Sequence, residues 1–207
     1  MFSPKFEVKI NGADRVFNVE LLSEFAKKYD FYKYTGGRFS WFFILQVIMY
    51  HDSYGIEPAE ILEAIKELEG VKDTKLIKDA TEFKRPPLKG LWHKHYFSAR
   101  FLAKNLQIHH GKNGVKRVIE KHLANGETLT DEVIRKMGDD LITNAFESRA
   151  DLSKLTGEWI VFAKYNNENY YLALGEHESN DEHLFKMISS TCIPQFDFLD
   201  DILNIKG

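Results

Sequence analysis

The feature that most restricts the fold is a pair of β-prone runs in the C-terminal half. Residues 158–165 are apolar and rich in aromatic and β-branched side chains, and residues 170–175 return after the polar segment 166–169. Two such runs separated by a short polar turn are typical of an antiparallel hairpin. Any fold for this chain must therefore contain antiparallel sheet.

The rest of the pattern is mostly helical. Residues 5–19 alternate polar and apolar side chains around Asn11 and Gly12, which predicts a hairpin whose loop extends through Asp14. Residues 32–39 predict a loop. Apolar spacing predicts helices at residues 20–29, 40–50, 58–69, 99–106, 115–124, 130–149 and 181–190. The expected fold class is α+β, mainly helical, with a small antiparallel sheet and an N-terminal hairpin.

A proline-rich segment marks the best internal boundary. Residues 85–90 (Arg-Pro-Pro-Leu-Lys-Gly) are unfavourable for a helix or a central strand. Residues 1–83 are predicted to form a hairpin and a helical subdomain. Residues 84–207 are predicted to form a basic, histidine-bearing α+β part with the strand pair and an acidic tail. We expect the two parts to form one compact unit.

Composition excludes several classes of protein. Hydrophobic residues make up 43% and charged residues 29% of the 207 positions, which excludes global disorder. The most apolar window, residues 41–49, is far shorter than the roughly 20 residues of a spanning helix, so a buried helix is expected and no membrane contact. The single cysteine, Cys192, excludes an internal disulfide, and residues 1–7 lack a signal-peptide pattern. These features predict a cytoplasmic protein.

Positive charge is concentrated in residues 84–121. The segment has one acidic residue, Glu120, and a net charge of +9, so the rest of the chain carries −12 of the total of −3. Such a division predicts a surface for an anion, first of all RNA or DNA. Its ten basic residues are Lys84, Arg85, Lys89, Lys94, Arg100, Lys104, Lys112, Lys116, Arg117 and Lys121.

The sharpest motif is residues 92–96, Trp-His-Lys-His-Tyr. In an extended conformation His93 and His95 point to the same face. Two imidazoles can act as the acid and base that cleave a phosphodiester. We expect His93 and His95 to be catalytic, with Glu176 as a possible carboxylate base. The residues expected to hold phosphate or stack a base are Lys89, Trp92, Lys94, Tyr96, Arg100, Lys104, Lys112 and Arg117.

Other interpretations of these residues stay open. His93 and His95 could be structural, or could ligate a metal with His109, His110 or residues 176–178, although the spacing fixes no such set and no metal or cofactor is predicted. Glu176 could lie in a solvated turn. The sequence therefore leaves open whether the chain is an enzyme.

Three functions follow from these alternatives. The first is a nucleic-acid-directed phosphodiesterase, with RNA as the first expected substrate. The second is a non-catalytic binding module of the immunity, inhibitor or regulatory type, which docks an acidic protein partner or nucleic acid through the basic segment. The third is a metal-dependent hydrolase. Binding that depends on phosphate contacts is expected to weaken steeply as the salt concentration rises.

Residues 86–190 resemble compact bacterial RNase toxins in residue types. The basic, histidine-bearing stretch is followed by a two-stranded, aromatic-rich unit. The resemblance implies a small sheet that uses His, Arg, Lys and Glu side chains in place of a metal. It has no ordered motif, so it assigns no individual residue.

Overall fold

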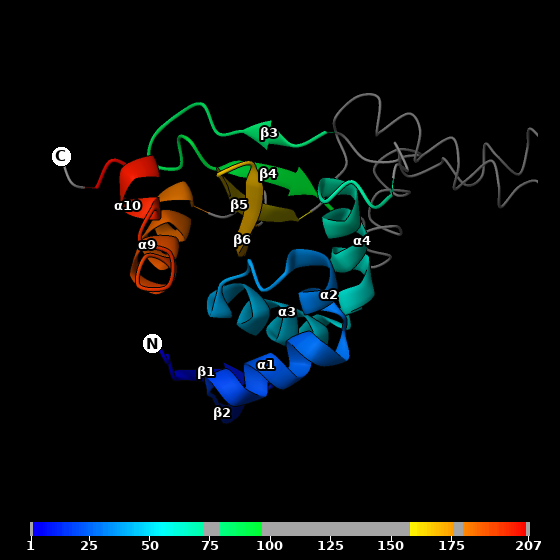
Figure 1. Ribbon diagram of the computed structural model, residues 1–207. Helices are drawn as coiled ribbons and strands as arrows, with labels where there is room; N and C mark the ends of the chain where they lie inside the picture. Colours follow the sequence, from blue (N-terminus) through cyan, green and yellow to red (C-terminus); the bar gives the residue numbers. More distant parts are fainter. Residues whose placement is uncertain (1, 73–78, 97–157, 176–179, 206–207) are drawn as a thin grey trace, which may run out of the picture. The chain divides into compact units, whose positions relative to one another are not determined.

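A computed structural model describes residues 2–72, 79–96, 158–175 and 180–205 (Figure 1). The chain divides into two compact units, one formed by residues 1–98 and 157–207 and the other by residues 99–156. The helices predicted at residues 99–106, 115–124 and 130–149 lie outside the described residues. The described elements are helices and antiparallel sheets, so the chain is an α+β protein.

A four-stranded antiparallel sheet lies at the centre of the first unit. Its order is β3 (Thr81–Glu82), β4 (Trp92–His95), β5 (Trp159–Tyr165) and β6 (Glu168–Gly175). The predicted strand pair is present as β5 and β6, and β3 and β4 extend it. The predicted four-residue turn shortens to Asn166 and Asn167, both with positive φ (50° and 63°), which suits the right-handed twist of a tight hairpin.

The outer edge of β6 is covered by the segment that enters α3 (Trp41–Tyr54). Phe39 forms a parallel bridge with Tyr171, and the Ser40 amide donates to the Tyr171 carbonyl at 2.8 Å. Further along, the Gln46 side-chain amide donates to the Leu174 carbonyl at 3.0 Å and accepts from the Leu174 amide at 2.8 Å. Because these bonds use backbone groups that an edge strand leaves open, β6 offers little of its edge for pairing with another chain.

The N-terminal hairpin consists of β1 (Phe6–Ile10) and β2 (Ala13–Phe17). Its turn is only Asn11 and Gly12, with φ of 49° and 83°, so the longer loop predicted through Asp14 is wrong. The register pairs Ile10 with Ala13, which places Asp14 inside β2. Asn and Gly both tolerate positive φ, and this permits the two-residue connection.

Side-chain caps mark the start of three helices described in the first unit. Asn18, Ser40 and Asn180 accept hydrogen bonds from backbone amides of α1 (Val19–Lys28), α3 and α9 (Asp181–Cys192). Proline begins α4 (Pro58–Leu68), where its missing amide hydrogen costs nothing, and α10 (Leu199–Ile202) is a single turn. The bounds of α1, α3, α4 and α9 confirm the spacing-based predictions to within a few residues, whereas α10 was not predicted.

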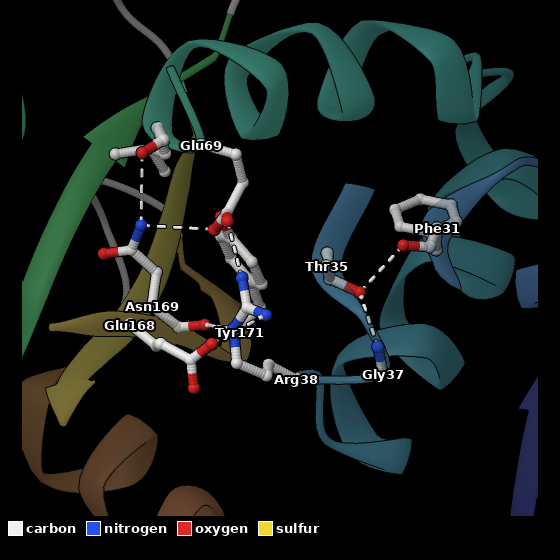
Figure 2. Close-up of polar contacts among 9 residues, drawn as sticks. Phe31, Thr35, Gly37, Arg38, Glu69, Glu168, Asn169 and Tyr171 are labelled. Carbon is white, nitrogen blue, oxygen red and sulfur yellow. Dashed lines mark hydrogen bonds and ion pairs between the residues drawn. The ribbon is translucent and has the colours of Figure 1, made fainter. Parts of the chain in front are cut away.

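A short helix, α2 (Phe31–Thr35), occupies part of the predicted loop at residues 32–39. The Thr35 hydroxyl donates to the Phe31 carbonyl at 2.7 Å and accepts from the Gly37 amide at 3.2 Å (Figure 2). Gly36 follows with φ of 60°, a left-handed conformation that ends helices. The prediction missed α2 because one turn shows no apolar period.

The core lies where α3 packs on the sheet. The apolar window predicted as a buried helix forms most of α3, and Phe43 is fully buried with its ring centroid 6.1 Å from that of Tyr171. Phe162 of β5 joins the same layer, 6.2 Å from Tyr171 between centroids. Within the described ranges, none of the helices has the length and apolar character needed to cross a membrane.

The proline-rich segment predicted as a boundary is the loop that joins β3 to β4. Phe83 donates its amide to the Leu91 carbonyl at 2.8 Å, and Thr81 pairs with His93. Gly90 has a φ of 92°, and a Cβ there would lie 3.2 Å from Ile202 Cγ2. The loop therefore lies inside the first unit and packs closely against α10.

Candidate functional site

The histidines of the Trp-His-Lys-His-Tyr motif lie on β4, in the extended conformation expected for them. His93 pairs with Val161 and His95 with Trp159 across the β4–β5 ladder. Because side chains alternate along a strand, both imidazoles point to one face of the sheet. Their ring centroids are 5.9 Å apart, with the ring planes at 81°. Both side chains are half-buried.

Two aromatic rings complete what we call the imidazole–aromatic cluster, defined as Phe83, His93, His95 and Trp159. Phe83 and Trp159 lie against His93, with centroid distances of 4.7 and 5.0 Å. Trp159 also meets His95 edge-on at 5.9 Å. The cluster draws on the β3–β4 loop, β4 and the first residue of β5. Neither Phe83 nor Trp159 was predicted as a site residue. Both lie outside the motif at residues 92–96, and neither stands out among the 28 aromatic residues of the sequence.

Lys94 lies on the opposite face, in the interior. It is 4% exposed, and its ammonium lies 2.9 Å from a carboxylate oxygen of Glu67 on α4. The alternation that puts His93 and His95 on one face forces Lys94 onto the face that packs on α4. Lys94 is therefore a buried ion-pair partner in this structure, and it is not part of an exposed phosphate-binding surface.

Tyr96 is also interior, at 2% exposed, and its hydroxyl donates a short hydrogen bond to the Glu158 carboxylate. Burial raises the pKa of Tyr96 well above its usual range, and the negative charge of Glu158 adds to the effect. Its ring is enclosed, so it does not present a surface on which a base could stack. The burial of Tyr96 therefore gives no support to the stacking role expected of it.

Trp92 shares the face of Lys94 but is only half-buried. The Lys164 ammonium lies 3.6 Å from the centre of the Trp92 ring, a close cation–π contact. Trp92 is therefore on the opposite face of the sheet from His93 and His95. It could stack a base only at a place separate from the imidazoles.

Three cations of the basic segment are exposed on the β3–β4 loop: Lys84, Arg85 and Lys89. Lys84 pairs with Glu82 at 3.2 Å, with a side chain that is 76% exposed. The other predicted residues, Glu176, Arg100, Lys104, Lys112 and Arg117, lie outside the described residues, as do His109 and His110. Among the predicted phosphate ligands within the described residues, Lys89 is exposed. It also lies close to His93 in the sequence.

A second polar cluster was not predicted (Figure 2). The Arg38 guanidinium donates to Glu69 at 2.5 Å and to the Asn169 carbonyl at 3.1 Å, and it lies 3.3 Å from Glu168. Glu69 also accepts the hydroxyl of Tyr171 at 2.5 Å. Burial raises the pKa of Tyr171 above its usual range, and the hydrogen bond to Glu69 adds to the effect. The cluster joins the entry to α3, the end of α4 and the start of β6, so its evident role is to hold these elements together.

Metal ligation finds no support among the described residues. In residues 2–72, 79–96, 158–175 and 180–205, no three His, Cys, Asp or Glu side chains gather as a metal site requires. His93 and His95 form a pair on their face of the sheet. The described residues therefore place two imidazoles among aromatic rings.

Comparison with known proteins places the chain in no family. No family model, no curated protein and no solved structure matches it.

Proposed function

We propose that this protein cleaves phosphodiester bonds in RNA, with His93 and His95 as its acid and base. The observation that supports this most is the pairing of two half-buried imidazoles on one face of β4, with ring centroids 5.9 Å apart. Imidazole is the side chain best suited to exchange protons near neutral pH. Two of them on one surface meet the basic requirement of a metal-independent cleavage.

The proposed reaction uses side chains of this protein and the 2′-hydroxyl of the RNA itself. One neutral imidazole removes the proton of a ribose 2′-hydroxyl, whose oxygen attacks the neighbouring phosphorus. The other, as imidazolium, gives its proton to the 5′-oxygen that leaves. The P–O5′ bond breaks as the P–O2′ bond forms, which yields a 2′,3′-cyclic phosphate and a free 5′-hydroxyl. Each imidazole must come within about 2.6–3.2 Å of its oxygen, on either side of one phosphate.

The developing charge on the phosphate requires a cation. Lys89 is the nearest exposed candidate in sequence, since the β3–β4 loop leads directly into the strand that carries His93. Arg85 lies on the same loop and is also exposed. Such groups would position the backbone of the nucleic acid without reading its sequence. Arg100, Lys104, Lys112 and Arg117 stay predicted contacts.

The exposed loop also suits a binding module without chemistry. Lys84, Arg85 and Lys89 could dock an acidic protein or a nucleic acid by charge alone. This alternative also predicts binding that depends on salt, but it gives His93 and His95 no chemical role. The two functions therefore differ in what the histidine variants do.

The decisive variants are His93→Asn, His95→Asn and the double change, assayed on labelled single-stranded RNA in EDTA. Each single change is expected to lower kcat/KM by about 10²-fold or more, since general acid or base catalysis contributes about 10²–10⁴-fold. His183→Asn, at an exposed position on α9, is the matched control and is expected to keep full activity.

Two results would contradict the proposal. If wild-type protein binds RNA with a steep salt dependence but never cleaves it, the binding module is the better account. If the double variant is folded by circular dichroism and cleaves as the wild type does, His93 and His95 are not the catalytic groups.

A further inference from the structure

We infer that Trp159 is a positioning residue that fixes the orientation of both catalytic imidazoles. The inference rests on the proposed function and adds to it a residue that the motif does not contain. Among the described rings, Trp159 is the one in contact with both His93 and His95, at centroid distances of 5.0 and 5.9 Å. A shift of its indole would therefore move or release both groups together.

The contacts of Trp159 restrain the two imidazoles differently. Phe83 and Trp159 both pack against His93, at interplanar angles of 44° and 43°, and they also meet each other edge-on at 5.9 Å. His95 meets the indole edge-on, at 82°. A histidine ring on a strand is otherwise free to rotate about its χ2 torsion, which has broad wells. Aromatic contacts at these angles limit that rotation and set the directions of the ring nitrogens.

The indole is itself held by the sheet and by the helix beside it. Trp159 pairs with His95 on one side and with Gly175 on the other. A Cβ at Gly175 would lie 3.5 Å from Cε3 of Trp159 and 3.3 Å from Cδ2 of Leu184 on α9. The glycine therefore lets both Leu184 and the indole lie close to the β6 backbone. This close approach limits the movement of the indole, as a positioning residue requires.

Positioning matters because proton transfer depends steeply on geometry. A misplacement of about 1 Å can cost about 10²-fold in rate. Since Trp159 is placed beside the imidazoles and not at the phosphate, its loss should reduce the catalytic step more than binding. The expected signature is a lower kcat with KM nearly unchanged.

The test compares Trp159→Leu, Trp159→Phe and the control Trp41→Leu in the full chain with single-stranded RNA. Trp159→Leu is expected to lower kcat by about 10²-fold, and Trp159→Phe, which keeps an aromatic ring, to recover most of that loss. Trp41 is half-buried at the start of α3 and belongs to no proposed site, so Trp41→Leu should retain wild-type kcat.

A second readout does not depend on activity. The ring protons of His93 and His95 lie in the ring currents of the indole, so Trp159→Leu should shift both histidine signals in NMR spectra. The His183 signal should stay in place.

The outcomes separate the inference from the proposed function. No cleavage by the wild type would refute the function and the inference with it. If the wild type cleaves but Trp159→Leu shifts both histidine signals without lowering kcat, or raises KM alone, then only the positioning role of Trp159 is overturned.

Discussion

Replacing Lys94 with methionine is expected to lower the free energy of unfolding by about 3 kcal/mol, because breaking a buried ion pair from one side typically costs about 3–5 kcal/mol. The Lys94 side chain is 5% exposed and that of its partner Glu67 is 13% exposed, with 2.9 Å between the charged atoms. The variant leaves the Glu67 carboxylate in the interior without this ammonium. Urea unfolding at pH 7 measures the loss.

Two further variants make this result specific. Lys66→Met removes a lysine one position before Glu67, but its pair with Glu63 is more open, at 22% and 42% exposed, so a cost of at most about 0.5 kcal/mol is expected. Lys94→Met combined with Glu67→Leu should regain much of the loss, because an apolar pair can replace a buried ion pair. A stable Lys94→Met protein that binds RNA weakly would instead make Lys94 a phosphate ligand.

The second large effect expected is a loss of stability at alkaline pH. Burial raises the pKa of both Tyr96 and Tyr171 above the ordinary value of 10.0, and Glu158 and Glu69 add to the respective shifts. Below pH 10 the folded and unfolded chains both keep these protons, so stability is unaffected. Above pH 10 only the unfolded chain releases them, which costs the folded state about 1.4 kcal/mol per pH unit for each tyrosine.

Unfolding measured at pH 8, 10 and 11 should therefore show the two tyrosines lowering stability by about 2 kcal/mol over the last unit, because each is already half ionised in the unfolded chain at pH 10. Burial also raises the pKa of Cys192 from 9.0 to about 11, so this thiol adds to the loss from pH 9 upward. Tyr171→Phe is expected to be less stable than the wild type at pH 8 but to show a shallower decline above pH 10. An equal slope in the two proteins would mean that Tyr171 ionises in the folded state as readily as in the unfolded chain.

Local pattern was sufficient to predict most elements of the first unit. Alternation with Asn11 and Gly12 predicted the β1–β2 hairpin, and β-branched and aromatic runs predicted β5 and β6. These signals work because the side chains of a strand or helix face repeat at a fixed period. By contrast, β3 is two residues long and α2 five, so neither is long enough to show a period.

The candidate site was predictable only in part. An extended Trp-His-Lys-His-Tyr segment already places His93 and His95 on one face. Counting charges along the chain, however, treats every lysine as exposed, and Lys94 faces α4 because of the same alternation. Its partner Glu67 is 27 positions away in sequence, and Trp159 reaches His95 only through β4–β5 pairing. These contacts depend on how segments distant in sequence align in the folded chain. A single sequence does not specify that alignment.

The most direct test of the account is the chemical identity of the ends that cleavage leaves on RNA. The wild-type protein is incubated in EDTA with an RNA oligonucleotide and with the same oligonucleotide carrying one 2′-deoxyribose at the cleaved position. Attack by a 2′-hydroxyl between the imidazoles of His93 and His95 predicts a 2′,3′-cyclic phosphate from the first and no cut at that position in the second. A 3′-hydroxyl end with a 5′-phosphate, or a cut at the deoxyribose, would contradict this mechanism.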